Sequence, residues 1–463
     1  MSTATSDLMS ADEAPLALGA GPTEVHAWPG VVGGVLRESP LDVETLSDYR
    51  AAGGYAVLSA SLSEVYEILA QTSAVTGLSG RGGAAFPFWR KLQTARSSFD
   101  LRGVQPVVIG NGAEGEPLSV KDRYLMRHRP HLIVDGLALT AAAVNAQRAT
   151  LYVEDSRSRA AVQAAIEEAD SLLDIDIDVV IAQDTYVAGE ESAVVRAIEH
   201  GIARPIERPP HIYESGVGGA PTMVSNVETL ARVARAMAPN PAAGEAPFLV
   251  TVSAPNRSAA VVEIPEGLGV AEFLYAEGYC SPDEPPAGVL AGGFFGGVLP
   301  LTEDLVFSWE SFKQKGGGLG CASIYVIPRR ESVLPVASKV ATYYAQNNAQ
   351  QCRSCMSSTR DIAAHLTTTP PPMGYQQNRG GDPLDELTRW STQIVGRGAC
   401  ALPNGVALML RSLLRHFPDE LNEHLELVSK TRAVEHTGPV WPRGVEYGAA
   451  APSVPVPTLE ALS

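Results

Sequence analysis

The sequence predicts an α/β fold, in which an α/β domain is followed by a small β-rich domain and then by a helical bundle. Three observations lead to this prediction. Strand-like apolar runs alternate with helical patterns from about residue 45 to 240, short β-rich segments occupy Phe248–Thr302, and helical spacing dominates from Lys339 onward. The 463 residues suffice for two to four domains, each with its own core.

The first domain is predicted over residues 41–242, after an N-terminal extension of residues 1–40. The extension has weak periodicity and many turn-forming residues, so we expect it to lie on the surface or to be partly disordered. Within the domain, alternating strands and helices imply ligand-binding loops at the strand ends. The expected strands are Val104–Ile109, Ala149–Val153 and Ile177–Ala182, and the expected helices are Ile133–Val144 and Ser158–Ala169.

The second domain, residues 243–325, has the size and element order of a β-grasp domain. Its expected elements are strands at Phe248–Ser253 and Ala259–Ile264, a helix at Val270–Glu277, and a strand at Val289–Gly292 with a glycine-rich turn. Residues 330–435 then fit three or four antiparallel helices, at Lys339–Asn347, Ser357–Leu366, Pro383–Val395 and Asn404–Phe417. The proline-rich tail, residues 436–463, has no core of its own.

The net charge of −17 argues against nucleic acid or an anionic membrane as a partner, and favours basic proteins or small molecules. The N-terminus lacks the basic and apolar regions of a signal peptide. The segment Leu132–Asn145 is too short to span a bilayer and contains Asp135, so it reads as a buried helix. We therefore expect a cytoplasmic protein with no direct membrane insertion.

Three segments of the first domain are candidate ligand loops. Gly80–Lys91 (GRGGAAFPFWRK) lets backbone N–H groups approach a ligand, and Arg81 and Lys91 add the positive charge that a phosphate needs, although glycine-rich turns often only turn. Gly110–Arg123 (GNGAEGEPLSVKDR) carries Glu114 and Glu116 where a Rossmann loop would meet pyrophosphate. These carboxylates could accept hydrogen bonds from ribityl or ribose hydroxyls or from a nicotinamide amide. The alternative is a solvated acidic loop without a ligand.

The third segment, Tyr186–Glu199, places Glu190 and Glu191 at the start of a helix. They could bind a polar ligand or simply favour the helix dipole, and the sequence does not choose. The following residues, Arg208–Leu230, are rich in proline and glycine and predict a long ordered loop. It ends at Asn226, which can cap the next helix.

The cysteines are odd in number and do not suggest a disulfide scaffold. Cys352 and Cys355 form a C-x-x-C pair, and Cys400 follows 45 residues later, before a helix. Iron–sulfur, zinc, a redox dithiol and coincidence all remain open on this spacing. Cys280 and Cys321 lie in β-rich segments and are expected to be buried small hydrophobes.

These motifs occur together and in one order: GRGGAAF, N-x-x-E-x-EP with KDRYLM and PH, Y-x-x-GEE-x-A, PT-x-V-x-NVETL, and C-x-L before RHF. In this combination the chain resembles the flavin-bearing, NADH-oxidising subunit of respiratory complex I and the related diaphorase subunits of soluble hydrogenases and formate dehydrogenases. The resemblance runs from about Gly77 to Phe417. It implies a flavin-binding α/β domain, a β-grasp domain and a helical bundle that holds a [4Fe-4S] cluster.

The resemblance also implies roles for individual residues. Hydride would pass from the nicotinamide to FMN, which would release single electrons to the cluster. The FMN phosphate would lie at Gly80, Arg81, Gly82, Gly83 and Ala84, with Lys91 close by. The flavin would be lined by Asn111, Glu114, Tyr186, Gly189, Glu190 and Asn226. The nicotinamide nucleotide would face Phe86, Glu116 and Glu191, the two acids being the candidate catalytic residues.

Several residues depart from the family pattern. Ala113 replaces an acid, which removes one flavin hydrogen bond. His211 replaces an aromatic Phe that stacks on adenine, and Arg208 replaces a lysine, so the choice between NADH and NADPH stays open. The family cluster motif is E-S-C-G-x-C-x-x-C, and the match of Tyr344 and Ala345 to its lead-in places Ala349 over the first cysteine.

In that register Cys352, Cys355 and Cys400 are the three remaining ligands. A second register, with Ser358 as the third ligand, loses the lead-in match. Three thiolates suit a [3Fe-4S] cluster, or a [4Fe-4S] cluster with a non-cysteine fourth ligand.

The expected function is therefore a flavin and iron–sulfur oxidoreductase resembling NADH dehydrogenase (diaphorase). It would oxidise NAD(P)H and reduce a ferredoxin or a thioredoxin-like [2Fe-2S] subunit. Two alternatives remain: a non-catalytic homologue that serves as a docking subunit, motivated by Ala113, His211 and Ala349, and a zinc-stabilised binding protein.

Overall fold

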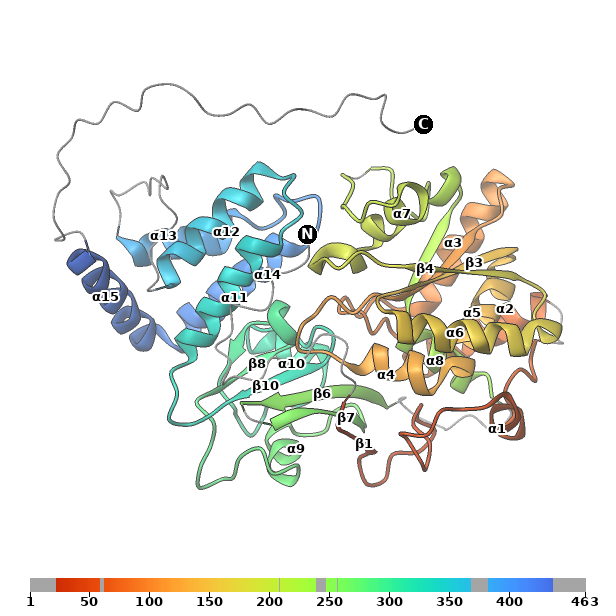
Figure 1. Ribbon diagram of the computed structural model, residues 1–463, viewed down its shortest axis with the longest axis horizontal. Coiled ribbons are helices and arrows are strands. Elements are labelled where there is room, and N and C mark those ends of the chain that lie inside the picture. The colour runs from red at the N-terminus through yellow and green to blue at the C-terminus, as the bar shows by residue number, and fades with distance from the viewer. Residues whose placement is uncertain are drawn as a thin grey trace, which may run out of the picture.

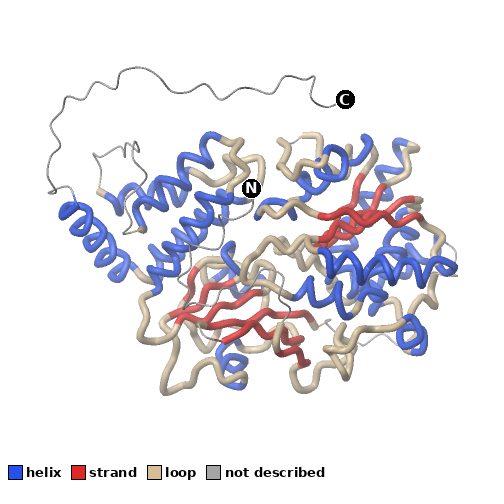
Figure 2. Tube along the Cα trace, viewed as in Figure 1, coloured by secondary structure: helices blue, strands red, loops and turns tan. Residues whose placement is uncertain are grey.

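A computed structural model describes residues 22–58, 62–207, 209–238, 247–255, 257–367 and 382–435. The strands gather in two separate sheets, and a region without strands follows them along the chain (Figure 2). These are the three parts that the sequence predicts, in the predicted order (Figure 1). Their boundaries at residues 41, 243 and 330 stay predictions.

The first sheet has four parallel strands in the order β4-β3-β2-β5. They are β2 (Val107–Gly112), β3 (Arg148–Val153), β4 (Asp176–Ile181) and β5 (Thr222–Asn226). Successive strands run from β2 outward to β4, and the chain then returns to the other side of β2. In open α/β sheets ligands bind beyond the carboxyl ends of the strands at such a reversal, which here lies between β2 and β5.

Eight helices of the described chain belong to this first part. They are α1 (Leu46–Ala51), α2 (Leu62–Val75), α3 (Phe88–Arg102), α4 (Lys121–His128), α5 (Pro130–Val144), α6 (Ser156–Ala169), α7 (Glu191–His200) and α8 (Val227–Ala236). Almost every residue of α5 is buried, as expected for the Leu132–Asn145 segment. Gly136 permits this packing, because a Cβ there would lie 1.9 Å from the carbonyl oxygen of Leu230 on α8.

The second sheet has six strands in the order β1-β7-β6-β10-β8-β9. They are β1 (Glu24–Ala27), β6 (Phe248–Ala254), β7 (Arg257–Ile264), β8 (Gly288–Ala291), β9 (Val298–Leu299) and β10 (Ser323–Ile327), with helices α9 (Val270–Ala276) and α10 (Trp309–Gln314). Its core includes the packed rings of Phe248, Phe273 and Phe307. The sequence did not predict β1, which comes from the N-terminal extension and pairs in parallel with β7.

Residues 22–44, called here the N-terminal strap, connect the second sheet to the first part. The backbone N–H groups of Val35 and Leu36 donate to the buried Glu263 carboxylate of β7, at 2.6 and 3.0 Å. Farther along, the Tyr124 hydroxyl of α4 donates to the carbonyl of Pro40 at 2.6 Å. Arg129 pairs with Glu44 at 2.8 Å. The strap therefore fixes the two parts against each other.

The third part is a helical bundle of α11 (Val333–Asn347), α12 (Arg353–Leu366), α13 (Pro383–Gln393), α14 (Leu402–His416) and α15 (Pro418–Glu435). The first four match the predicted helices, three of which begin earlier than expected. The last, α15, was not predicted as a separate helix. Within the described residues, no helix combines the length and apolar character needed to cross a membrane.

Candidate functional site

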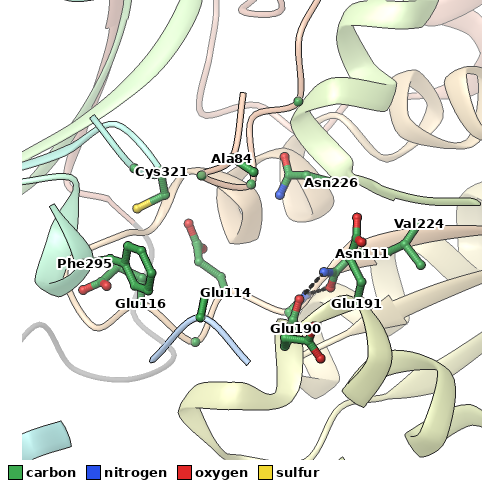
Figure 3. A pocket seen from close by; sticks show the side chains of 18 of the residues that line it. Ala84, Asn111, Glu114, Glu116, Glu190, Glu191, Val224, Asn226, Phe295 and Cys321 are labelled. Carbon is green, nitrogen blue, oxygen red and sulfur yellow. Dashed lines mark hydrogen bonds between the residues drawn. The ribbon is translucent and has the colours of Figure 1, made fainter. Parts of the chain in front are cut away.

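A cavity of about 450 Å³ lies where the four-stranded sheet predicts a ligand site, beyond the ends of β2 and β5. All three parts of the chain contribute to its wall (Figure 3). Fourteen of the residues predicted to contact FMN or the nucleotide line it: Gly80, Gly82, Gly83, Ala84, Phe86, Lys91, Asn111, Glu114, Glu116, Tyr186, Gly189, Glu190, Glu191 and Asn226.

The glycine-rich loop presents backbone rather than side chains to the cavity. The N–H of Gly80 donates to the carbonyl of Phe86 at 2.9 Å, which closes the loop just before α3. Gly83 has φ +113°, a conformation that residues with a Cβ rarely adopt. A Cβ on Gly82 would contact the Cβ of Asn226 at 3.4 Å, so the loop passes close to the end of β5.

Lys91 provides the positive charge beside this loop. Its Nζ donates to a Glu191 carboxylate oxygen at 2.7 Å and to the Val224 carbonyl at 2.8 Å. An ammonium group next to backbone N–H groups in a glycine-rich loop is the arrangement that binds phosphate. The residues present therefore fit the phosphate of FMN.

The expectation that the Arg81 side chain adds charge to this loop is wrong. The side chain is only 3% exposed and turns away from the cavity into the second part. There its guanidinium stacks over Phe248 at 4.5 Å and Trp309 at 4.6 Å, with Glu266 at 3.8 Å. Burial lowers the pKa of Arg81 to about 9. The Arg81 side chain therefore points into the second part because its guanidinium group makes cation–π contacts there, away from water.

Asn111 and Asn226 end the two strands that meet at the cavity. The Asn111 amide donates to the Gly189 carbonyl at 2.9 Å. The Asn226 side chain accepts from the Glu228 N–H at 2.9 Å, which caps α8 as predicted, and donates to Asp122 at 2.7 Å. Both polar side chains are thus held rigidly where the cavity begins.

Glu114 is a buried residue and not part of a solvated acidic loop. Its carboxylate accepts from the Ser119 hydroxyl at 2.6 Å and from the N–H groups of Asp122 and Arg123 at 3.1 and 3.0 Å. These donors open α4, so Glu114 caps that helix while lining the cavity. Both carboxylate oxygens accept these bonds, so Glu114 is held in place by α4 and Ser119.

Glu116 lies at one end of the cavity, near Phe295 and Cys321 (Figure 3). The Tyr186 hydroxyl donates to its carboxylate at 3.3 Å, and a second hydroxyl, that of Tyr344 in the bundle, lies 3.4 Å from the first. Burial raises the pKa of Glu116 to about 8. The carboxyl group is therefore mostly protonated at neutral pH.

Glu190 and Glu191 begin α7 but act differently. One carboxylate oxygen of Glu190 accepts from the N–H groups of Ser192 and Ala193, both at 3.0 Å, and from the Ser192 hydroxyl. This is ordinary helix capping, the plainer of the two interpretations of these acids. Glu191 instead pairs with Lys91 across the cavity wall, so this acid links α7 to the segment Gly80–Lys91.

His211, a predicted nucleotide-binding residue, is not among the described residues that line the cavity. The His211 ring stacks on Tyr213, with ring centres 5.0 Å apart and planes 8° from parallel. Its backbone N–H donates to Glu214 at 2.8 Å. Arg208 lies outside the described residues. Contact of either residue with a nucleotide stays a prediction.

Sequence reasoning missed cavity residues that come from other parts of the chain. Cys321 was expected to be a buried small hydrophobe, but it lines the cavity, where burial raises the pKa of its thiol. The preceding glycines, Gly316–Gly320, were the available signal of a close approach. Other missed lining residues are Ser119, Asp122, Ser225, Thr229, Gly292, Phe295, Gly320 and Leu402.

The three predicted cysteine ligands come together in the bundle. Cys352, Cys355 and Cys400 line a hollow of about 10 Å³, and Ala349 lines it too. Cys352 precedes α12, Cys355 lies in its first turn, and Cys400 precedes α14. The Ala399 N–H donates to the Cys352 sulfur at 3.3 Å. This shared lining supports the register that places Ala349 at the first ligand position.

Ser358, the third ligand of the alternative register, does not line the hollow. Its hydroxyl donates to the carbonyls of Ser354 at 2.7 Å and Cys355 at 3.3 Å. Burial raises the pKa of the Cys355 thiol to about 12, so a thiolate there needs a positive partner. Soft iron suits such a donor set. Across the described ranges, no three His, Cys, Asp or Glu residues are grouped to hold a single metal ion.

The cavity and the hollow are adjacent. Cys400 and Leu402, at the start of α14, line both of them. A group bound in the cavity and a cluster bound by the cysteines would therefore be separated by this one segment.

Comparison with known proteins identifies two family regions. Residues 74–235 match the Nuo51 FMN-binding domain, and residues 335–424 match the NADH-ubiquinone oxidoreductase-F iron–sulfur binding region. A subunit of the NADH-quinone oxidoreductase of Rhizobium meliloti (strain 1021) is 28% identical over 415 residues, covering 83% of this chain and 95% of that protein. The mitochondrial NADH-ubiquinone oxidoreductase 51 kDa subunit of Aspergillus niger is 28% identical and covers 77% and 76%.

Solved structures agree with these matches. The NAD+-reducing [NiFe]-hydrogenase in the air-oxidised state gives a TM-score of 0.68 at 25% identity, covering 83% of this chain and 67% of the other. The H2-reduced state, at 24% identity, gives the same TM-score and supports the fold. Together the two family regions occupy more than half of the sequence, and they include the cysteine hollow and most of the residues that line the cavity. The chain therefore belongs to the family of FMN- and iron–sulfur-containing NADH-oxidising subunits of complex I and NAD+-reducing hydrogenases.

Proposed function

We propose that the cavity binds FMN and a reduced nicotinamide nucleotide together, and that the hollow binds an iron–sulfur cluster that supplies electrons to a protein acceptor. The observation that carries this proposal is the segment Cys400–Leu402, which lines both sites. FMN, when bound, can take a hydride from a reduced nicotinamide and release the electrons one at a time. The described residues serve to bind, orient and shield it.

The chain offers a distinct group for each part of FMN. The backbone of Gly80–Ala84 and the ammonium of Lys91 would hold the phosphate. The polar groups at the ends of β2 and β5, Asn111 and Asn226, would face the ribityl chain and the ring. Tyr186, Gly189 and Glu190 would close the site from the side of α7. Ala113 also lines it and offers no side-chain acceptor where family members have an acid.

For the nicotinamide nucleotide we propose Phe86, Glu116 and Glu191. Phe86 lines the cavity yet is 44% exposed, which leaves its ring open to a flat ligand. Glu116, protonated at neutral pH, can donate a hydrogen bond from its carboxyl group to a carboxamide oxygen. Glu191 can accept from ribose hydroxyls beside Lys91. Arg208 and His211 would act on the adenine side, where they would influence the choice between NADH and NADPH.

For the cluster we propose ligation by Cys352, Cys355 and Cys400. It is a [3Fe-4S] cluster, or a [4Fe-4S] cluster with one non-cysteine ligand, since Ala349 stands at the first of the four ligand positions. The acceptor would be a ferredoxin or a thioredoxin-like [2Fe-2S] subunit, because Cys280 and Cys321 alone cannot hold a second cluster. All five cysteines are free thiols, which supports a cytoplasmic site of action.

Anaerobic absorption and EPR spectra, before and after NADH addition, test this function. We expect flavin bands and broad cluster absorption that bleach on reduction by NADH. A non-catalytic docking subunit remains the second candidate, favoured by Ala349 at a ligand position and by His211 outside the cavity. It predicts flavin that neither NADH nor NADPH bleaches. Zinc without iron or sulfide in a metal analysis would contradict both.

Lys91→Gln should weaken FMN binding by roughly 10- to 100-fold, the effect of losing one hydrogen bond to a charged group. The variant keeps a polar side chain, one atom shorter, but removes the cation at the glycine-rich loop. Fluorescence titration of the FMN-depleted protein measures the change. Lys430→Gln, which removes an exposed lysine on α15, is the matched control and should bind FMN normally. Equal affinities in the two variants would rule out the phosphate role of Lys91.

Glu116→Gln should remove a pH dependence of flavin reduction by NADH. In the wild type the carboxyl group is neutral below its pKa of about 8 and ionises above it, so the rate should fall as pH rises through 8. Glutamine stays neutral, so its rate should be flat across this range. Stopped-flow reduction between about pH 6 and 9 measures both profiles.

The same substitution should change stability in a defined direction. The folded-state pKa of about 8 exceeds the ordinary glutamate value of 4.5, so the folded protein binds this proton more tightly than the unfolded chain. Glu116 therefore becomes progressively more destabilising from about pH 4.5 up to 8. The melting temperature of the Glu116→Gln variant should therefore fall less over this pH range than that of the wild type. A wild-type rate profile without a step near pH 8 would contradict the assignment.

A further inference from the structure

The two stretches of sequence that contain the cysteines carry a charge opposite to that of the whole protein. Glu190, at the start of α7, approaches Cys400 from the cavity side, since both residues line the cavity. The chain has a net charge of −17 and one acidic residue in about nine. Yet neither residues 332–360 nor residues 387–418 contain any aspartate or glutamate, and these two stretches include all three cysteine ligands. Their basic residues are Lys339, Arg353, Arg360, Arg389, Arg397, Arg411 and Arg415.

Several of these residues form one surface beside the cysteine hollow. α12 begins just after Cys352. One face of it carries Arg353, Met356 and Arg360, which are separated from each other by three and four residues. All three side chains are exposed. On the other side of the hollow, the Arg397 carbonyl accepts from the Ser354 hydroxyl at 2.7 Å. The loop that carries exposed Arg397 therefore lies against the first turn of α12.

This surface also has an apolar component and access to the outside. Met356 and Val395 are each 41% exposed and add apolar area to this surface. α12 lies on the side of the bundle away from the six-stranded sheet (Figure 1). Cys352 and Cys400 are half-buried. Two of the three cysteines are thus partly accessible, and exposed basic and apolar side chains lie close to them along the chain. We call Arg353, Met356, Arg360, Val395 and Arg397 the cysteine-side surface.

We propose that the cysteine-side surface docks a small one-electron carrier protein with a carboxylate-rich face. This inference rests on the proposed function and specifies its acceptor. Arginines around an apolar centre are typical of a protein interface. The overall negative charge repels an acidic carrier from most of the molecule, and the local arginines attract it at this one place. A basic carrier would instead be attracted to most of the remaining surface, away from the cluster.

One acidic residue lies at the edge of this surface. Asp361, the first acid after residues 332–360, is half-buried and accepts from the Ser357 hydroxyl at 3.4 Å. Asp361 follows Arg360 in the sequence and lies farther along α12 from the cysteines than Arg353 does. The arginines closest to the cysteines are therefore the ones to change in a test.

The test compares two carriers of opposite charge with the cofactor-loaded protein. The probes are a purified acidic [2Fe-2S] ferredoxin and basic cytochrome c, each reduced anaerobically at the expense of NADH. Arg353→Glu/Arg397→Glu should slow ferredoxin reduction about 10-fold or more at low salt and should accelerate cytochrome c reduction. Rising salt should slow ferredoxin reduction by the wild type. Misfolding cannot produce the gain with cytochrome c.

Controls separate this proposal from the proposed function. Arg157→Glu/Arg159→Glu makes the same charge change at two exposed residues of α6, and its ferredoxin rate should match the wild type within about twofold, as for surface changes outside an interface. Reduction of a small neutral dye by NADH should be unchanged in every variant. No dye reduction by the wild type would refute the proposed function itself. With dye reduction intact, equal losses with both carriers, or no change with either, would overturn the docking surface.

Discussion

Cys400→Ser should abolish electron delivery to the protein acceptor while flavin reduction by NADH continues. Cys400 lines both the cavity and the cysteine hollow, so its loss removes a cluster ligand from the segment between the two sites. Changes to residues that only support a metal ligand reduce affinity or activity about 10- to 100-fold, and loss of a ligand should exceed that. We expect acceptor reduction to fall at least about 100-fold, with iron content reduced in parallel.

Cys280→Ser is the matched control, because Cys280 lines neither the cavity nor the hollow. Its iron content, acceptor rate and flavin bleaching should equal those of the wild type. Single-turnover reduction of the flavin by NADH distinguishes loss of the cluster from loss of the flavin. Full acceptor activity in Cys400→Ser would show that electrons leave the flavin by another route.

Ala349→Cys should convert the three-cysteine site into a four-cysteine site. Ala349 lines the same hollow as the cysteines, so a thiolate there replaces a methyl group without a change in chain direction. Where the wild type holds a three-iron cluster, its EPR signal in the oxidised protein should disappear in the variant, and a signal seen only after reduction should replace it. Survival of the cluster in air should lengthen several-fold, because thiolates then ligate all four irons. Iron and sulfide analysis with EPR measures each change.

The alternative register provides the control for this experiment. Ser358→Cys adds a thiol within the same helix, but Ser358 is bonded to the carbonyls of Ser354 and Cys355 and does not line the hollow. It should leave the cluster unchanged. If Ser358→Cys and not Ala349→Cys produced the four-iron signal, the register with Ala349 at the first ligand position would be wrong. The register with Ser358 as the third ligand would then be correct.

Much of the fold could be predicted because its central elements are buried on all sides. β2 and β3 read as continuous apolar runs, which parallel strands covered by helices require. β1 could not be predicted in this way. Its four residues, Glu24–Ala27, form a strand because β7, more than two hundred residues later, offers them an edge. Pairing between distant segments leaves little trace in local sequence.

The same distinction applies to the site: features set by neighbouring residues could be predicted, and features set by distant segments could not. Segments with a local motif could be placed at the cavity from the sequence alone, as Gly80–Lys91, between α2 and α3, and Asn226, at the end of β5, illustrate. The direction of Arg81 depends on Phe248 and Trp309, which belong to another part of the chain. The presence of Cys321 in the cavity depends likewise on how the second sheet packs against the first part.

Net charge describes the whole chain and not any one surface of it. The total of −17 favours basic partners, whereas the two stretches of sequence that contain the cysteines are positively charged. A sum over the chain contains no information about where the charges lie. Once the helices of the bundle are known, the distribution can be read directly.

The N-terminal strap also determines where this protein can be shortened for laboratory work. β1 covers the edge of β7, and Val35 and Leu36 supply two of the donors that satisfy the buried Glu263. A version that begins after residue 44 would lose both, exposing a long apolar strand edge and leaving a buried carboxylate without these partners. Bare strand edges pair with other chains. Insolubility of such a fragment would therefore reflect an uncovered edge and not a failure of the flavin site to form.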